Sequence, residues 1–434
     1  MAQPNVLLVV ADDLGYGDPG CYGGDIPTPN LDRLADDGVR LTDWHANGPI
    51  CSPTRASLLT GKYPQHAGMP SNGPEGHPST DPAGGLPTDQ PTLADLLGEA
   101  GYRTGAFGKW HLGMTDDDDP LAHGFDDFFG VRSGCVDYFS HLQVWLQAHG
   151  HAPYHDLWDG REEVRRDGAY LPHRITERAC EFVRGERPFF AYLAYNAPHY
   201  PLHAPPEYDD RVTHLEGERR RYGALVSVLD EGVGQLLDAL EDEGVADDTL
   251  VVFTSDHGPS REVRNHLDGA GTPFRGSSAG PFRGHKFSLF EGGIRVPGLV
   301  AYPGEIEGGA VCDELATTMD VLPTVLDYCG VDPPEDCDGE SLRGTLADGA
   351  PSPHDRVYWA FRDQAAVRAG DWKLVLDGEE IPPDATTPEF RTVEGPHLAN
   401  LADDPGESTN LADARPGRRA DLEADLQQWL DEVQ

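Results

Sequence analysis

Lysine, paired cysteines and long apolar runs are all scarce in this 434-residue chain, and each scarcity excludes a class of protein. Only four lysines occur, and the 33 basic residues are outnumbered by 75 acidic ones, giving a net charge of −42. Such a chain cannot assemble the basic surface that binding to nucleic acid or to an anionic membrane requires. Because the acidic residues are spread along the sequence, we interpret them as a solvated, salt-adapted surface.

The seven cysteines include no CxxC pair, and their odd number argues against both a zinc ribbon and a disulfide framework. No stretch approaches the roughly 20 apolar residues of a membrane span. The N-terminal segment lacks the charged start and the long apolar run of a signal peptide. We therefore expect a reduced, cytoplasmic protein.

Short apolar runs alternate along the chain with longer segments of helical periodicity. This alternation predicts an α/β fold with a large, mixed but mainly parallel sheet that is flanked by helices. The predicted strands are residues 5–10, 103–109, 188–196 and 249–255, and the predicted helices are residues 30–38, 92–101, 175–186 and 222–244.

The pattern changes near residue 351. Residues 356–363 and 365–376 read as antiparallel strands, and a helix is expected over residues 415–433. We predict a catalytic domain over residues 1–350 and a small C-terminal α+β subdomain over residues 351–434.

Two segments rich in Gly, Pro, Asp and His, residues 113–167 and 258–284, read as long functional loops. Their ring-bearing side chains could pack on the organic part of a substrate or could be structural; they are Trp145, Tyr154, Trp158 and His266.

Polar residues stand where the four predicted strands end. In a parallel sheet all the carboxyl ends lie at one edge, so these residues should meet in one crevice. They are Asp12 and Asp13, then Lys109 and His111, then His199, and finally Asp256 and His257.

Three carboxylates in close quarters repel one another unless a cation lies between them. The oxygen ligands favour calcium or magnesium, whereas His257 adds a nitrogen that is more usual with manganese or zinc. The remaining predicted groups would hold a tetrahedral oxyanion such as sulfate or phosphate; they are Arg55, Lys109, His111, His199 and Lys286.

Cys51 stands before a short predicted helix, with Ser52 as its cap, Pro53 in its first position and Gly61 as its stop. A thiolate there would be a poor partner for a hard metal, and an oxygen nucleophile would suit the site better.

The segment Cys51-Ser52-Pro53-Thr54-Arg55, followed by "ASLLTGKYP", resembles the C-x-P-[ST]-R signature of the type I sulfatases. Other segments resemble sulfatases in the same order and cover nearly the whole chain: "PNVLLVVADDLGYGDPGCYGG", "TPNLDRLADDGVRLTDWHA", "GYRTGAFGKWHLG", "NAPHYPLHAPPEY", "VVFTSDHG", "GHKFSLFEGGIRVPGLV" and "LANLADDPGESTNLA". The resemblance implies an alkaline-phosphatase-like fold and the hydrolysis of sulfate esters of small molecules or carbohydrates.

In that family a formylglycine-generating enzyme oxidises the cysteine to an aldehyde. Its hydrate attacks sulfur with one hydroxyl, and the second hydroxyl then expels sulfate. Carried over to this chain, the resemblance implies one divalent metal, calcium first with magnesium or manganese open, bound by Asp12, Asp13, Asp256, His257 and the modified Cys51. His257 departs from the asparagine that many members carry.

The resemblance also implies roles for the remaining site residues. Arg55 would hold the formylglycine, and Lys109 with His111 would orient its hydrate and the sulfate. Lys286 and His199 would contact the sulfate, with His199 protonating the leaving alcohol. Two other functions stay open: a phosphate or phosphonate monoester hydrolase on the same fold, and a non-catalytic protein that binds sulfate esters through an unmodified Cys51.

Overall fold

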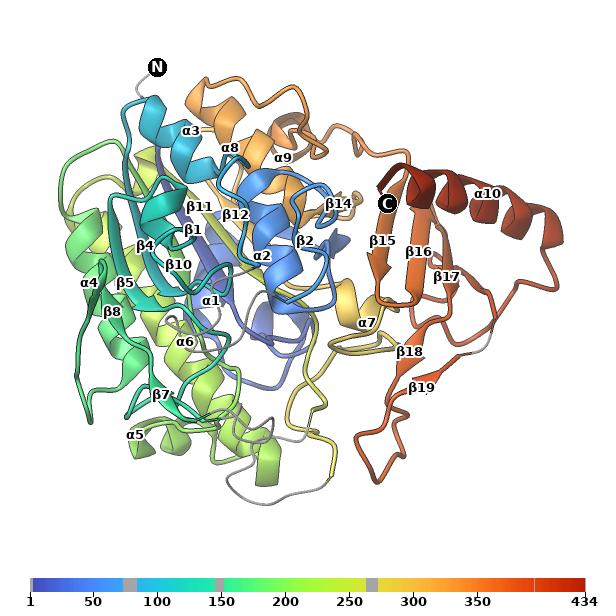
Figure 1. Ribbon diagram of the computed structural model, residues 1–434, viewed down its shortest axis with the longest axis horizontal. Coiled ribbons are helices and arrows are strands. Elements are labelled where there is room, and N and C mark those ends of the chain that lie inside the picture. The colour runs from blue at the N-terminus through green and yellow to red at the C-terminus, as the bar shows by residue number, and fades with distance from the viewer. Residues whose placement is uncertain (1–2, 73–83, 145–151, 263–271, 394, 434) are drawn as a thin grey trace.

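A ten-stranded sheet forms the centre of the larger part of the molecule (Figure 1). The computed structural model describes residues 3–72, 84–144, 152–262, 272–393 and 395–433. In spatial order the strands are β13 (Ala310–Cys312), β2 (Val39–Leu41), β12 (Gly298–Ala301), β11 (Thr249–Ser255), β1 (Asn5–Ala11), β10 (Phe189–Ala194), β4 (Arg103–Lys109), β5 (Asp127–Val131), β8 (Trp158–Asp159) and β9 (Glu162–Glu163).

The middle of this sheet is parallel. β1 pairs in parallel with β10 and β11, β10 pairs with β4, and β4 pairs with β5. Antiparallel pairs occur toward both ends, where β11 meets β12 and β5 meets β8. The mixed, mainly parallel sheet expected from the sequence is therefore confirmed, and the four predicted strands are its four central members.

Alternate residues of β1 belong to two separate cores, as a sheet covered on both faces requires. Leu7 and Val9 pack in the core with the helices of one face, whereas Leu8 and Val10 pack in the other. The helices of the first core are α1 (Pro29–Asp37), α4 (Leu171–Val183) and α6 (Gly217–Asp242). Those of the second are α2 (Cys51–Thr60), α3 (Leu93–Glu99), α8 (Val321–Cys329) and α9 (Arg343–Asp348).

A smaller antiparallel sheet with one long helix follows and lies beside the main body (Figure 1). Its strands are, in order, β15 (Val357–Phe361), β16 (Gln364–Ala369), β17 (Trp372–Leu376) and β20 (His397–Asn400), and its helix is α10 (Pro416–Val433). A third core buries Leu398 and Leu426 of this part together with Ile50, Leu289 and Met319 of the main body. The predicted C-terminal α+β subdomain is confirmed as a fold, while its boundary at residue 351 stays a prediction.

The remaining short elements lie mostly in the connections. They are the strand pairs β3 (Trp44–His45) with β14 (Ala316–Thr317), β6 (Leu142–Gln143) with β7 (Tyr154–His155) and β18 (Glu379–Glu380) with β19 (Arg391–Thr392), and the helices α5 (Pro206–Asp209) and α7 (Glu291–Ile294). Within the described ranges, none of the helices combines the length and the apolar character needed to traverse a bilayer.

Residues 113–167 are not one loop, because β5 lies within them and extends the main sheet beyond β4. Trp145 and His266 lie outside the described residues. Tyr154 is buried, and the guanidinium of Arg132 lies over the half-buried ring of Trp158, 4.0 Å from its centre.

Candidate active site

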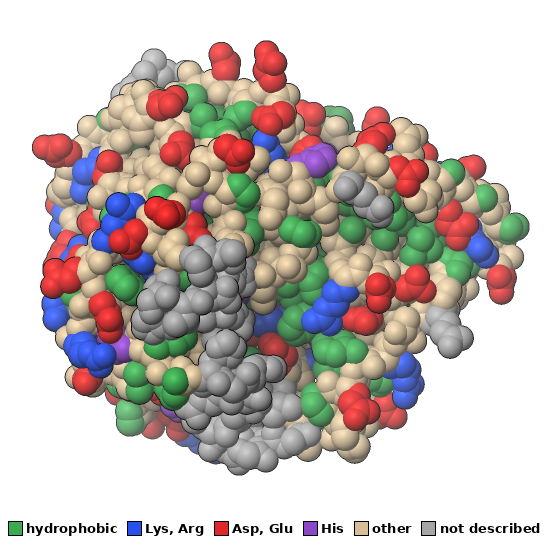
Figure 2. Space-filling model, in the orientation of Figure 1, with side chains coloured by type: hydrophobic (Ala, Val, Ile, Leu, Met, Phe, Trp, Pro, Cys, Tyr) green, Lys and Arg blue, Asp and Glu red, His purple; other side chains and the backbone are tan. Residues whose placement is uncertain are grey.

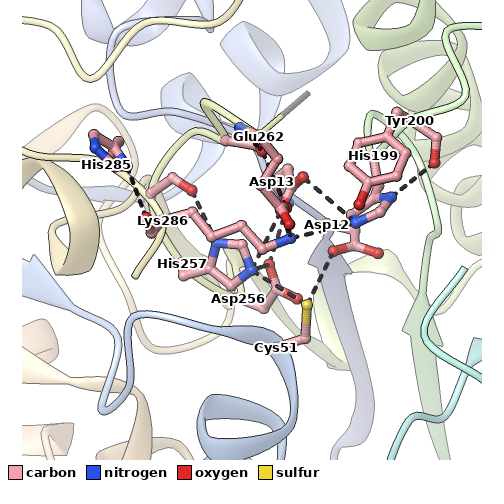
Figure 3. A network of polar contacts seen from close by, with 12 residues as sticks. Asp12, Asp13, Cys51, His199, Tyr200, Asp256, His257, Glu262, His285 and Lys286 are labelled. Atoms are coloured by element: carbon pink, nitrogen blue, oxygen red, sulfur yellow. Dashed lines mark hydrogen bonds and ion pairs between the residues drawn. The ribbon is translucent and has the colours of Figure 1, made fainter. Parts of the chain in front are cut away.

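The carboxyl ends of β1, β4, β10 and β11 bring the predicted polar side chains to one buried site. Figure 3 shows those that follow β1, β10 and β11. The register explains this, because β1 pairs with both β10 and β11 up to their last residues. Asp12 and Asp256 come directly after paired strands, and the backbone N–H of Asp256 donates to the carbonyl of Ala11 at 3.0 Å. The crevice predicted from the strand ends is therefore present.

Cys51 is the first residue of helix α2 and is 2% exposed. The helix begins two residues earlier than predicted, and Ser52 does not cap it, because its hydroxyl donates to the carbonyl of His111 at 2.7 Å. Gly61 ends the helix as predicted, with φ of 69°. Burial raises the pKa of the Cys51 thiol well above its ordinary value, with Lys109 opposing the shift, so the encoded side chain is a neutral thiol and a weak nucleophile.

Asp12, Cys51, Asp256 and His257 each direct one possible ligand atom into a common space, and these atoms lie within 4.8 Å of one another. The sulfur of Cys51 is 3.3 Å from Nε2 of His257 and 3.7 Å from Oδ1 of Asp12. Asp13 joins the group, since its Oδ1 lies 3.3 Å from the same His257 nitrogen.

The donor set fits a divalent cation. Nδ1 of His257 contacts the carbonyl of Gly258 at 2.8 Å, and because a carbonyl only accepts, the ring proton is on Nδ1. Nε2 therefore presents a lone pair toward Oδ1 of Asp13 and toward Oδ1 of Asp256, which is 3.5 Å away. Three acceptors facing one another repel unless a proton or a cation lies among them.

Arg55 fixes one of these carboxylates. Its Nε and Nη2 donate to Oδ2 of Asp256 at 3.2 and 2.9 Å, and its Nη1 donates to the carbonyl of Lys109 at 3.1 Å. Burial alone would raise the pKa of Asp256, but the neighbouring cations, Arg55 and Lys109 among them, outweigh it and hold that pKa far below its usual value. The predicted contact of Arg55 with a modified Cys51 stays a prediction.

Two of the four lysines are buried in the site. Nζ of Lys109 donates to Oδ2 of Asp12 at 2.7 Å, and Nζ of Lys286 donates to Oδ1 of Asp13 at 3.0 Å. Burial works to lower the pKa of each lysine, yet the adjacent carboxylates leave both pKa values raised, so both side chains are ammonium ions. The Lys109 ammonium has further N–H groups with which to bind an anion, whereas Lys286 directs its three toward Asp13, Glu262 and His199.

His199 faces Lys286 with the ring nitrogen that can exchange a proton. Its Nδ1 donates to the carbonyl of Tyr200 at 2.7 Å, so Nε2 is free to accept from Nζ of Lys286, which is 3.3 Å away. The ring of Tyr200 lies over the imidazole with 4.1 Å between centroids. Together these contacts fix the orientation of His199.

His111 has a buried ring, and a Cβ at residue 134 would meet its Cε1 at 2.7 Å, so Gly134 is required there. Burial, followed by the charges of Lys109 and Arg55, lowers the pKa of His111 well below its ordinary value. The ring is therefore neutral.

One acidic residue of the site escaped the sequence analysis. Oε2 of Glu262 lies 3.0 Å from Nζ of Lys286, which therefore bridges Glu262 and Asp13. Glu262 stands in a segment without periodicity, and no pattern in the sequence marks it. The sequence also gave no sign of His285, which stands next to Lys286. Its Nε2 accepts from the backbone N–H of Ile381 at 2.7 Å, and its Nδ1 donates to the carbonyl of Lys286.

Comparison with known families identifies both parts of the chain. Residues 4–331 match the family model "Sulfatase", and residues 284–434 match the model "N-sulphoglucosamine sulphohydrolase, C-terminal". Together the two models span nearly the whole chain, and the second includes Lys286 as well as the C-terminal sheet.

Curated proteins and a solved structure agree with these matches. The chain is 32% identical to Arylsulfatase J of Mus musculus, over 96% of this chain and 74% of that protein. It is 36% identical to N-acetylgalactosamine-6-sulfatase of Homo sapiens, over 84% and 70% of the two chains. The crystal structure of Ps i-CgsB in complex with k-i-k-neocarrahexaose superposes with a TM-score of 0.85 at 30% identity, covering 100% of this chain and 94% of that one. The chain thus belongs to the sulfatase family of sulfate-ester hydrolases, within the alkaline-phosphatase-like superfamily.

Proposed function

We propose that this sulfatase cleaves sulfate esters with Cys51 in its formylglycine form and with one divalent cation, calcium in preference to magnesium or manganese. The observation that carries the proposal is the position of Cys51, whose buried, neutral sulfur lies between Asp12 and His257. This neutral thiol is a weak nucleophile, so the nucleophile is an oxygen of the aldehyde hydrate.

Asp12, Asp13, Asp256 and His257 are the residues that would hold the cation. When bound, it would neutralise the facing carboxylates and polarise the sulfate ester. The three carboxylates are hard oxygen ligands, which supports calcium, and the His257 nitrogen is the feature that keeps manganese open.

The lysines bind and orient the sulfate in this proposal. Lys109 and Lys286 are ammonium ions that Asp12 and Asp13 fix in position before substrate arrives. Preorganised donors of this kind stabilise the charge that develops on the sulfuryl oxygens without moving during the reaction. His111 adds a neutral ring to the same end of β4.

His199 is placed to protonate the leaving alcohol. Its Nδ1 proton is committed to the Tyr200 carbonyl, so the mobile proton must be on Nε2, the atom that faces Lys286 and lies 3.6 Å from Oδ2 of Asp13.

Conversion of Cys51 must precede folding in this proposal. All ten residues of α2 are buried, so no enzyme could reach Cys51 in the folded chain. We therefore infer a formylglycine-generating enzyme as a partner that acts on the unfolded segment around Cys51.

The substrate class that we propose is a sulfated carbohydrate. Its support is the named substrate of one relative, N-acetylgalactosamine 6-sulfate in N-acetylgalactosamine-6-sulfatase, and the oligosaccharide bound to Ps i-CgsB.

Peptide mass spectrometry of the Cys51 segment, in protein made together with a formylglycine-generating enzyme, tests the proposal. We expect the aldehyde mass and sulfate release from a sulfated sugar, and Cys51→Ala should abolish release while the protein stays folded. Thiol-only protein with full activity, or an active Cys51→Ala variant, would refute the nucleophile. Faster cleavage of a phosphate or phosphonate monoester of the same alcohol would favour the rival hydrolase, and unmodified protein that binds but does not cleave would favour the non-catalytic function.

A further inference from the structure

A second cluster of possible metal ligands lies outside the proposed active site, in the segment between β5 and α4. It consists of His141, His155 and Asp167, each of which offers one ligand atom within 4.8 Å of the others. His141 precedes β6 and His155 ends β7, and the pairing of Leu142 with His155 holds the two imidazoles side by side. Their rings meet edge to face, with 5.9 Å between centroids.

Both rings are buried and both present an unused lone pair. His141 is 0% exposed and the side chain of His155 is 1% exposed. Among the described residues, Nδ1 of His141 and Nε2 of His155 have no hydrogen-bond partner. Leaving a buried polar atom unpaired destabilises the folded protein, so two of them on adjacent rings require an explanation.

The opposite nitrogens fix the tautomers. Nε2 of His141 lies 3.1 Å from the carbonyl of Ala169, which can only accept, so its Nδ1 carries the lone pair. Nδ1 of His155 lies 3.0 Å from Oε1 of Glu163, so in the neutral ring Nε2 carries the lone pair. A carbonyl or a carboxylate behind the imidazole is the usual outer partner of a metal-binding histidine.

We propose that His141, His155 and Asp167 form a second metal site, which binds a late first-row divalent cation, zinc by its donor set. Two imidazole nitrogens and one carboxylate suit zinc and leave a fourth position for water, whereas calcium and magnesium prefer oxygen. Asp167 is exposed, so the cation can enter from solvent.

The cation would join three separate parts of this segment. His141 ends a turn, and its backbone N–H donates to the carbonyl of Asp137 at 2.9 Å. In the same turn the hydroxyl of Tyr138 contacts the carbonyl of His199 at 2.6 Å. A bound cation therefore stabilises the segment that supports His199. Its role is structural, and the cation takes no part in the reaction.

Zinc titration of the full chain tests this site separately from the active site. The protein carries Cys51→Ala and an excess of calcium, so that the first cluster lacks its sulfur and is occupied. Competition with a chromogenic chelator should give one zinc per chain. Cobalt(II) should give visible absorption without a sulfur-to-metal charge-transfer band, because the second cluster contains no cysteine.

Variants decide between a metal site and a packed histidine pair. His155→Gln should abolish the saturable binding, and the exposed Asp167→Asn should weaken it without affecting folding. Glu163→Gln, which touches no metal, should weaken binding about 10-fold through the orientation of His155. The control is His66→Gln, which alters an exposed histidine–aspartate pair (Nδ1 of His66 to Oδ2 of Asp338, 2.8 Å) and should change nothing. Absence of zinc binding in the parent protein, or binding that is unchanged in both His155→Gln and Asp167→Asn, would overturn the proposal.

Discussion

Replacing Arg55 by methionine should destabilise the protein strongly, even though methionine fills much of the same volume. Arg55 is 1% exposed and donates twice to Asp256 and once to the carbonyl of Lys109. The substitution leaves the Asp256 carboxylate buried without its cation. Removing one partner of a buried ion pair costs about 3–5 kcal/mol, and the unpaired carbonyl adds about 1 kcal/mol. We expect a total loss of about 5 kcal/mol.

Urea unfolding in the presence of a chelator, followed by circular dichroism, measures this loss. The double variant Arg55→Met with Asp256→Asn is the informative control, because asparagine removes the buried charge that the single substitution exposes. It should be about 2 kcal/mol more stable than the sum of the two single effects predicts, within the range found for residues in direct contact. A loss below about 1 kcal/mol for Arg55→Met, or strictly additive effects in the cycle, would refute the assignment of the ion pair as the source of stability.

Two further predictions concern charge elsewhere in the molecule. Burial raises the pKa of Glu407 from 4.5 to about 7, with Glu291 adding to the shift and Lys373 opposing it; because the folded-state pKa is the higher one, stability falls as pH rises from about 4.5 through 7, by about 3 kcal/mol at 1.36 kcal/mol per unit. Glu407→Gln should lack this loss. If the free energies of unfolding of variant and parent, measured with urea, change equally with pH across this range, the raised pKa of the buried Glu407 carboxyl is contradicted. Separately, the net charge of −42 and the acidic side chains scattered over the face in Figure 2 predict a melting temperature that rises between 0.01 and about 1 M KCl, as the Debye length falls from about 30 to 3 Å. Tetramethylammonium chloride should raise the melting temperature equally. A melting temperature that does not change with salt concentration would show that surface repulsion does not limit stability.

The site could be predicted from the sequence because its framework is encoded locally. Apolar runs identify β1, β10 and β11, β4 follows a predicted helix, and the polar residues stand at the end of each strand or within five residues of it. Asp12 and Asp256 needed only one further rule, that parallel strands end at one edge.

Other features depend on contacts that no local pattern records. β5 is five residues long and contains a glycine, and parallel pairing with β4 makes it a strand. Glu262 reaches Lys286 from a segment without periodicity. Ser52 has the composition of a helix cap, but the carbonyl of His111 competes successfully for its hydroxyl. In each case a tertiary partner decides the outcome.

Backbone geometry explains how two consecutive carboxylates can serve one site. Successive side chains of a strand point to opposite faces, so an extended continuation of β1 would separate Asp12 from Asp13. Asp13 instead has φ of 67°, in the left-handed region that aspartate tolerates better than most residues. Its N–H donates to Oδ1 of Asp256 at 3.2 Å, and its carbonyl accepts from Tyr222 at 3.0 Å, which holds this conformation. The turn therefore directs Asp13 toward His257 while Asp12 faces Cys51, and the strain is maintained by the same Asp256 that completes the cluster.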